Sequence, residues 1–524
     1  MENKIIYYFL FVILFTSCYK ENLNEDETKV EENVNYIKEG SITLGKKLMN
    51  PYSLKNMQLA YNSLYKKKKL KESIVLSPTH YYIRFLPSDS FEYNLLKSDT
   101  NLVLFSYPLD YEISEGEQYH DPSLPNYQIT WQYTKVPVNY CFPNIYYEVL
   151  DTLFMPMEIN VDSSKLKSKK LFKDIWDELL EESLILTNNL EKNEHKIQLK
   201  GSKWNPSATI KVWDDLIKQY IPLVGAKIRV RHFLHWDTEL TDANGYAKLE
   251  SFRYSVNYSI VWERANWDIR DGWYVQAYYN GPKLKGHWEL NIDGGKSIKY
   301  ASIHRAAVRI FYGENLGLPR PISYNTYVHK ICYIDDKGTG DYWANVGNGL
   351  LPDIRIYGKD PYTGDDKSTI RIFRTTSHEF GHAIQCLLMG NIQFWQVSKI
   401  IYESWADAVE WAITNKEYND LGLILPFYIQ SDMDHQDTWP YKNADNAYSP
   451  LFIDLIDDLN QYEIYGNNKP NDNVKGYSIS QLAQIALKSY GLTSLRDNLK
   501  KNKPNNVTDK QIDDLFTKYY EIWK

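Results

Sequence analysis

Cysteine is scarce in this sequence, with 4 residues among 524. Apart from Cys18 the chain has Cys141, Cys332 and Cys386, so at most one pair of these three can close and a disulfide framework is excluded. We expect most of them to be buried thiols that pack as small apolar side chains. The contents of 43% hydrophobic and 24% charged residues are typical of globular domains.

An excess of positive charge and long apolar runs are also missing. The formal net charge of -7 argues against a nucleic-acid partner, because such a partner selects for a basic face. Beyond the first twenty residues no apolar run is long enough to cross a bilayer, so we expect the body of the protein to be soluble. A chain of 524 residues is too long for one ordinary core and predicts roughly three domains.

The start of the chain does carry an apolar run, from Ile5 to Phe15 after Lys4, which suits the central region of an export signal. Two small residues then lead into Cys18, and this order resembles a bacterial lipoprotein signal. The resemblance implies that residues 1–17 are a signal peptide and that Cys18 carries a lipid anchor. It also implies an exported protein at the outer membrane or cell surface of a bacterium, with the periplasmic face and a plain secretory signal as alternatives.

The rest of the chain divides by composition and pattern. Residues 18–35 are charged and poor in large apolar side chains, which predicts a flexible tether. Residues 36–205 predict an N-terminal domain of mixed helices and strands, and residues 206–264 a small β-sandwich. Residues 265–524 predict a third domain that ends in a helical subdomain. The expected fold class is therefore multidomain α+β.

The β-sandwich prediction depends on alternating patterns such as "AKIRVRHF" and "YAKLESF" and on the turn "TDANGY", in which Gly245 takes the positive φ. The pair "PLVGAKIRV" and "TDANGYAKL" resembles the carboxypeptidase regulatory-like domain. That resemblance implies a structural role and covers only this part of the chain. A further loop, "DDKGTGD" at 335–341, lacks the spacing of a calcium loop and is interpreted as a surface turn.

The segment that carries chemistry is a predicted helix that starts near Ile370. Apolar residues recur there at alternating steps of three and four, and Gly390 ends the pattern as a C-terminal cap. On such a helix His378 and His382 project the same way with about 6 Å of rise between them, so both can reach one metal ion. Glu379 points about 100° away and can hold a metal-bound water.

A capping box formed by Thr376 and Glu379 is the alternative, and it would start a helix at that point. The apolar pattern that is already running from Ile370 argues against it. The sequence HEFGH therefore matches H-E-x-x-H, a pattern of moderate specificity on its own.

Zinc needs a third protein ligand, with a fourth position left for water. Cys386 lies about 12 Å along the helix axis from His378, so one ion cannot be held by Cys386 and both histidines. The metzincin pattern is excluded, because it needs Gly and His where this chain has Gln385 and Leu388. A second helix, "YESWADAVEWAI", supplies Glu403 at 21 residues after His382.

HEFGH followed by Glu403 and Asp407 resembles the gluzincins, the thermolysin-like zinc peptidases. The resemblance implies that Glu403 is the third zinc ligand and that Asp407 accepts a hydrogen bond from the ring of His378. Zinc bound in this way would acidify its water, and Glu379 would act as the general base in peptide hydrolysis. The expected partner is a peptide or protein substrate. The alternative is a helix whose polar stripe merely faces water.

Gluzincins also use a Tyr or His beyond the third ligand to stabilise the oxyanion. Candidates are His435, Tyr441 and Tyr448, of which Tyr448 is favoured because it precedes a predicted helix. The strand "PDIRIYG" before the HEFGH helix corresponds in order to the gluzincin edge strand that binds an extended peptide.

Two other functions stay open. An enhancin-like metallopeptidase directed at mucin glycoproteins also has H-E-x-x-H with a downstream glutamate, although "ESWAD" suits the thermolysin-like pattern better. A surface lipoprotein that binds without catalysis is the non-enzymatic alternative, but all four residues of the catalytic pattern are intact. The sequence does not indicate an oligomeric state.

Overall fold

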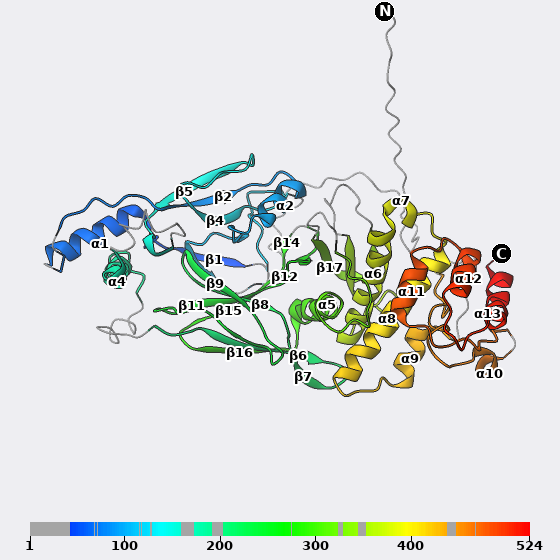
Figure 1. The fold of residues 1–524 in the computed structure, drawn as a ribbon. Coiled ribbons are helices and arrows are strands. Elements are labelled where there is room, and N and C mark those ends of the chain that lie inside the picture. The colour runs from blue at the N-terminus through cyan, green and yellow to red at the C-terminus, as the bar shows by residue number, and fades with distance from the viewer. Residues whose placement is uncertain are drawn as a thin grey trace, which may run out of the picture. The chain divides into compact units, whose positions relative to one another are not determined.

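The computed structural model describes residues 42–523 with internal gaps. The gaps are residues 68, 71, 115, 117, 126–127, 159–171, 191–202, 274, 323–327, 344–352, 437–446 and 467. The described residues form a mixture of helices and several sheets, so the predicted multidomain α+β class is confirmed (Figure 1). The export signal, Cys18 and the tether lie outside the described residues.

Contacts within the chain divide it into two compact units. The larger unit is Tyr36–Leu387 with Ile413–Ile424, and the smaller unit contains Leu388–Ala412 and Leu425–Lys524. The division into domains that the sequence predicts at residues 205 and 264 stays a prediction. None of the described helices is long and apolar enough to span a membrane.

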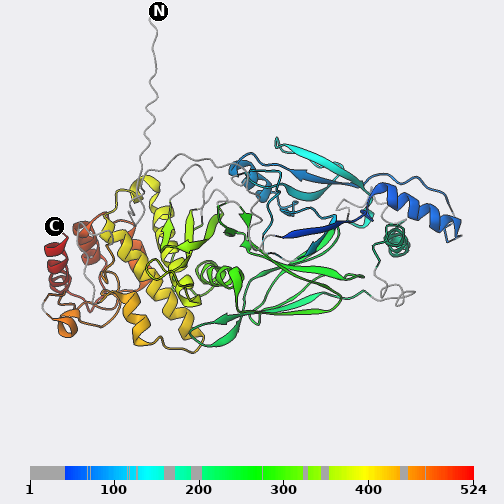
Figure 2. The ribbon, with the colours of Figure 1, turned by 180° about the vertical axis from the view of Figure 1, so that it is seen from behind.

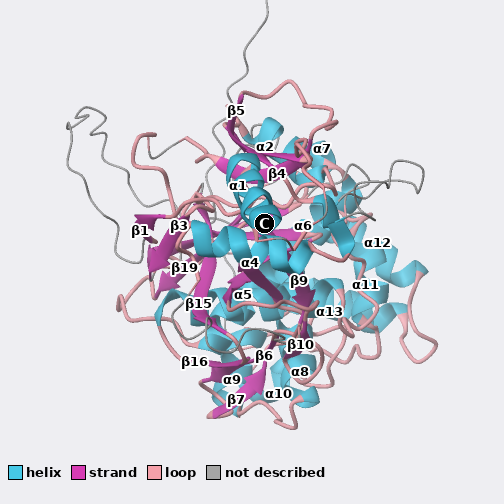
Figure 3. Ribbon diagram, turned by 90° about the vertical axis from the view of Figure 1, so that its left-hand side faces the viewer, coloured by secondary structure: helices cyan, strands magenta, loops and turns pink. Residues whose placement is uncertain are grey.

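The N-terminal part of the larger unit combines two small sheets with helices. Its strands pair in the orders β1-β3 and β4-β2-β5, and they are β1 (Thr43–Lys47), β2 (His80–Phe85), β3 (Tyr111–Ser114), β4 (Gln132–Pro137) and β5 (Tyr147–Leu153). The helices are α1 (Leu54–Lys66), α2 (Ser90–Ser98), the 3-10 helix η1 (Pro156–Glu158) and α4 (Trp176–Leu186). The side chain of Ser53 caps α1 by accepting from the N–H of Asn56, and α1 packs beside α4 (Figure 3).

Two four-stranded sheets follow, with strands between residues 207 and 292 (Figure 2). They extend beyond residues 206–264, the bounds predicted for the β-sandwich domain, which stays a prediction. One has the order β10-β6-β16 with β7 on β6, from β6 (Ser207–Asp214), β7 (Gln219–Pro222), β10 (Tyr246–Lys248) and β16 (His287–Ile292). The other has the order β15-β11-β8-β9, from β8 (Lys227–His232), β9 (His235–Leu240), β11 (Val256–Val261) and β15 (Tyr278–Leu284). The rings of Tyr258 and Trp288 meet between the sheets at 5.5 Å.

Gly245 makes the turn before β10 possible. Its φ is +74°, and a Cβ at this position would lie 2.3 Å from the carbonyl oxygen of Ile210. The carboxylate of Asp242 accepts hydrogen bonds from the N–H groups of Asn244 and Tyr246, which closes the turn. The predicted turn is therefore confirmed. Strand pairing of the two sheets continues through β16 to Ile292.

A six-stranded sheet lies beside the helix that contains the HEFGH sequence. Its order is β12-β13-β17-β19-β18 with β14 on β13, from β12 (Glu263–Arg264), β13 (Trp267–Asp271), β14 (Val275–Gln276), β17 (His329–Lys337), β18 (Gly340–Tyr342) and β19 (Ile354–Lys359). Helix α5 (Gly295–Phe311) packs against β13, and the HEFGH helix α6 (Thr369–Met389) contacts β17. Phe380 of α6 contacts the rings of Phe311 at 5.4 Å and His329 at 5.8 Å.

The segment "PDIRIYG" is confirmed as a strand, but its prediction as the edge strand is wrong. It forms β19, which pairs with β17 on one side and with β18 on the other. Both sides of its backbone are therefore occupied. Among the described strands of this sheet, the one that ends the row next to β19 is β18, which runs antiparallel to it. The "DDKGTGD" segment forms the end of β17, a turn and the start of β18.

The smaller unit is helical, as predicted for the C-terminal subdomain. It contains α7 (Asn391–Phe394), the first part of α8 (Lys399–Asp420), α9 (Phe427–Asp434), α10 (Gln461–Tyr465), α11 (Ile479–Ala486), α12 (Leu492–Lys501) and α13 (Asp509–Ile522). Capping boxes start α11 at Ser478 and α13 at Thr508. Leu482, Leu495 and Leu515 are fully or almost fully buried between these helices.

Two buried aspartates, Asp454 and Asp472, and the half-buried Asp457 lie together in the smaller unit. Asp454 accepts hydrogen bonds from the Tyr519 hydroxyl at 2.8 Å and from Gln461 at 2.7 Å, and Gln436 lies 3.3 Å from both Asp454 and Asp457. Burial raises the pKa of all three, to about 7 for Asp457 and about 8 for Asp472. The carboxyl groups of the folded chain therefore keep protons that the unfolded chain has lost.

This cluster predicts a stability that falls as the pH rises. A raised pKa stabilises the folded state below the unfolded pKa of 3.8, and this contribution is lost as the pH passes through about 7 to 8. We expect the free energy of unfolding, measured with urea, to be lower at pH 9 than at pH 5 by on the order of a few kcal/mol. The variant with both Asp457→Asn and Asp472→Asn should lose much of this slope, and an unchanged slope would contradict the assignment.

Candidate metal centre

Helix α6 begins where it is anchored to the β6–β7 turn. The carboxylate of Asp215 accepts from the N–H of Thr369 at 2.8 Å, and the Thr369 hydroxyl accepts from the N–H of Asp215 at 2.9 Å. The helix runs to Met389, and Gly390 follows with φ +89°, as the sequence predicts. Thr376 lies inside the helix and its hydroxyl donates to the carbonyl of Ile372, so it does not cap a helix start. The capping-box alternative is therefore wrong.

The two histidines stand one turn apart on α6. Their ring centroids are 4.8 Å apart and their planes cross at 83°, and both residues are buried. The ring of Tyr342, from β18, stacks over His382 at 6.4 Å. Burial raises the pKa of the Cys386 thiol to about 12, which keeps the thiol protonated.

The general-base candidate Glu379 is buried beside the backbone of β18. A Cβ built on Gly340 would lie 2.4 Å from Oε1 of Glu379 and 2.6 Å from Cγ2 of Thr375. Only glycine leaves room for the carboxylate at this position, because such distances are shorter than real Cβ contacts. The strand therefore passes directly by Glu379. Sequence reasoning missed Gly340 and Tyr342, since a three-residue strand has no periodic pattern.

The predicted carboxylates lie on helix α8, within the part that belongs to the smaller unit. Glu403 is completely buried and Asp407 almost completely. The Ser404 hydroxyl meets that of Ser449 at 2.6 Å, which holds the segment that carries Tyr448 against α8. Polar side chains so deeply buried in a helix point to an internal role and disagree with the alternative of a stripe that merely faces water.

Two of the three candidate oxyanion donors meet in the same unit. His435 and Tyr448 stack with ring centroids 5.5 Å apart and planes 15° apart. Nε2 of His435 lies 3.8 Å from a carboxylate oxygen of Asp407. The backbone of His435 has φ +52°, the left-handed region that non-glycine residues seldom adopt. The third candidate, Tyr441, lies outside the described residues.

The ligand atoms of the predicted triad come within reach of one ion. One atom from each of His378, His382 and Glu403 lies within 4.8 Å of the others. Two imidazoles and one carboxylate are a ligand set that zinc accepts, so the group is a geometric candidate for a metal site. A second group that meets the same 4.8 Å limit is His378, Asp407 and Glu410.

Comparison with known proteins adds no family to this geometry. No protein-family model matches the chain. No curated protein matches it significantly either. The gluzincin and carboxypeptidase regulatory-like resemblances are therefore predictions, which rest on the residues named above.

Proposed function

We propose that this protein is a zinc-dependent peptidase, with His378, His382 and Glu403 as the metal ligands and Glu379 as the general base. The observation that carries the proposal is that one ligand atom from each of these three residues lies within 4.8 Å of the other two. The sequence pattern alone selects the same three residues. Two imidazoles and one carboxylate are a donor set that zinc prefers, and three ligands leave a position open for water. The chemistry of the residues therefore fits the ion.

A bound zinc ion would supply a more acidic water molecule and would polarise the substrate carbonyl. The carboxylate of Glu379 would take a proton from the attacking water and return it to the leaving amine. Asp407 shares a 4.8 Å group with His378, which supports its proposed role of orienting that imidazole. His435 and Tyr448 are the proposed donors to the oxyanion, and their position beside Asp407 favours both over a residue elsewhere.

The proposed substrate is an extended peptide that adds to the edge of β18. Backbone groups of an edge strand can pair with another chain, and peptides bind many proteins in this way. Since β18 ends the described row of strands and passes Glu379 at Gly340, a peptide on this edge would carry its scissile bond toward the general base. We also propose that the protein is exported and anchored by a lipid on Cys18.

Gly340→Ala tests the fit between the strand and the general base. The new methyl group has to displace the Glu379 carboxylate or β18, because it would lie 2.4 Å from Oε1. We expect kcat/KM for peptide hydrolysis to fall by about 10²-fold, as displacements of about 1 Å typically cause. The zinc content should stay equal to that of the wild type, because the three atoms nearest to the new methyl group belong to Glu379 and Thr375 and not to a proposed ligand. The matched control is Gly294→Ala, where a Cβ meets nothing within 4 Å.

The proposal as a whole is tested by metal analysis of the purified protein combined with a protease assay on an unfolded protein such as casein. We expect about one zinc per chain and hydrolysis that stops after removal of the metal with a chelator and returns when zinc is added. Protein that contains zinc but hydrolyses no peptide would favour the non-catalytic binding function. Hydrolysis confined to heavily glycosylated mucin would favour the enhancin-like alternative.

A further inference from the structure

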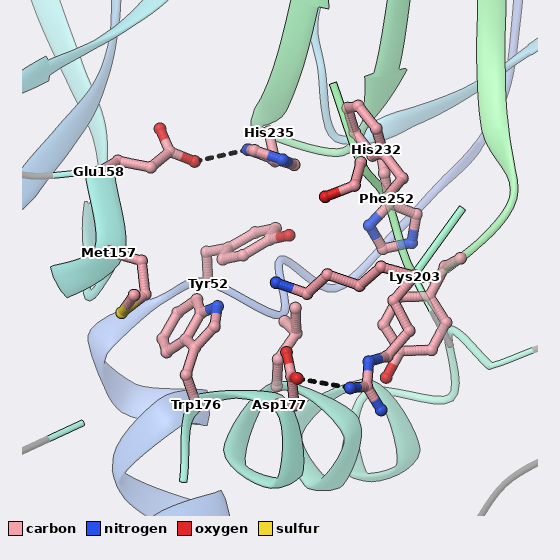
Figure 4. A pocket seen from close by; sticks show the side chains of 13 residues that line it. Tyr52, Met157, Glu158, Trp176, Asp177, Lys203, His232, His235 and Phe252 are labelled. Carbon is pink, nitrogen blue, oxygen red and sulfur yellow. Dashed lines mark hydrogen bonds and ion pairs between the residues drawn. The ribbon is translucent and has the colours of Figure 1, made fainter. Parts of the chain in front are cut away.

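The larger unit contains two cavities away from the HEFGH helix, and they differ in how their charges are balanced. The first, of about 90 Å³, is lined by Tyr52, Glu158, Trp176 and Asp177 (Figure 4). Its acidic groups are already paired, because Glu158 binds His235 at 2.8 Å as well as Lys135, and Asp177 binds Arg253. The carboxylates of this cavity therefore require no cationic ligand.

The second cavity, of about 240 Å³, opens between the N-terminal part and the sheet β15-β11-β8-β9. Asn257 of β11 lies opposite Arg231 of β8, and Ser259 lies opposite Asn280 of β15, so these four side chains share one face of the sheet. All four line the cavity, together with Tyr107, Ile113 and Pro282. Pro282 is exposed, which leaves the cavity accessible from solvent.

Arg231 is the unusual member of this lining, because among the described residues no acidic side chain lies within 4.0 Å of its buried charge. The residue is 4% exposed, and both of its hydrogen bonds leave from Nη1, to the carbonyls of Leu109 at 2.9 Å and Phe233 at 3.1 Å. Its Nε has no hydrogen-bond partner. Among the described residues no carboxylate lies within 4.0 Å of this guanidinium, whereas the neighbouring Arg229 reaches Glu263 at that distance.

A buried guanidinium stays charged, and an unpaired buried charge is unfavourable by several kcal/mol. A guanidinium can bind a carboxylate through two parallel hydrogen bonds, so a bound carboxylate would balance the charge of Arg231. The rest of the lining offers two amides and a hydroxyl, which match the hydroxyl groups of a ligand. No acidic side chain lines the cavity, so a zwitterion would leave its ammonium group unmatched.

We propose that this cavity binds a small hydroxylated carboxylate of the sugar-acid class, with its carboxylate on Arg231 and its hydroxyls on Asn257, Ser259 and Asn280. This binding site is separate from the proposed peptidase chemistry and does not depend on it.

The test is isothermal titration of the full chain with glucuronate and, in parallel, with glucose, which has a neutral hydroxymethyl group in place of the carboxylate. We expect glucuronate to bind with at least about tenfold lower Kd than glucose, since a charge-assisted pair contributes more than 1.4 kcal/mol. Arg231→Gln should raise the glucuronate Kd at least about tenfold. Arg496→Gln, which removes the same charge in the smaller unit, should leave this Kd unchanged. No binding to the wild type, or equal binding by Arg231→Gln, would overturn the proposal.

Asn257→Ala provides a second variant, because Arg231 also supports two backbone carbonyls and its loss can impair folding. This variant keeps the charge and should weaken glucuronate binding several-fold. Inorganic phosphate distinguishes a sugar-acid site from a general anion site. If phosphate binds as tightly as glucuronate and Asn257→Ala changes neither, the assignment of the ligand class is wrong.

Discussion

Glu379→Gln is expected to lower kcat for peptide hydrolysis by roughly 10² to 10⁴-fold, the range that a positioned general base contributes. The amide is nearly the same size as the carboxylate, so it keeps the close contact with β18 at Gly340, but it cannot accept a proton from water. Glu379 is not one of the three residues in the 4.8 Å ligand group. We therefore expect the zinc content to stay at the wild-type level.

This combination of lost activity and retained metal separates a catalytic role from a structural one. The control is Glu521→Gln, the same change of charge and shape at an exposed position of α13. It should hydrolyse peptides at the wild-type rate. Equal activity of Glu379→Gln and the wild type would contradict the catalytic role. A variant that is inactive because it no longer contains zinc would also contradict it.

The helix that carries the histidines could be predicted closely because its signal is local. The steps of three and four from Ile370 and the glycine at 390 set both ends of α6, and the structure has the helix from Thr369 to Met389. The turn at Gly245 was likewise predictable, since a tight turn needs positive φ there. Such features depend on residues within a few positions of one another.

Pairing between distant segments could not be predicted in this way. The order of segments along the chain suggests that β19 is the edge strand. In the structure the three residues of β18 pair with the outer side of β19 and form the edge instead. A strand so short has no pattern, and the turn before it was interpreted only as surface. The hydrogen bond between Tyr519 and Asp454 also joins residues that are 65 positions apart, so no local pattern in the sequence predicts it.

The strand that contains Arg231 was predicted correctly, but the burial of its polar face was not. Alternation in "AKIRVRHF" predicts one apolar face and one polar face that is half buried, and β8 does form. The structure buries the polar face as well, because aromatic residues of the N-terminal part cover it, with Phe105 only 4.4 Å from the guanidinium of Arg229. Burial of that face creates the unbalanced charge, and only tertiary structure reveals it.

Glu403→Ala is expected to yield purified protein with little or no zinc. The side chain is completely buried and belongs to the group that contains both histidines, so its removal leaves two ligands where zinc needs three. The loss of affinity should exceed the 10 to 100-fold that follows from removal of a residue that only orients a ligand. Asp407→Asn should fall within that smaller range. Zinc per chain, measured by mass spectrometry after dialysis against a weak chelator, reports both effects.

The matched comparison is Glu410→Ala, on the same helix, because Glu410 belongs to the second group with His378 and Asp407. Imidazole nitrogens are good zinc ligands. The group that contains both histidines and Glu403 should therefore bind zinc more tightly than the group with one histidine and two carboxylates. We therefore expect Glu410→Ala to retain zinc and activity. The reverse result, with zinc lost from Glu410→Ala and kept by Glu403→Ala, would move the metal to the second group and separate it from His382.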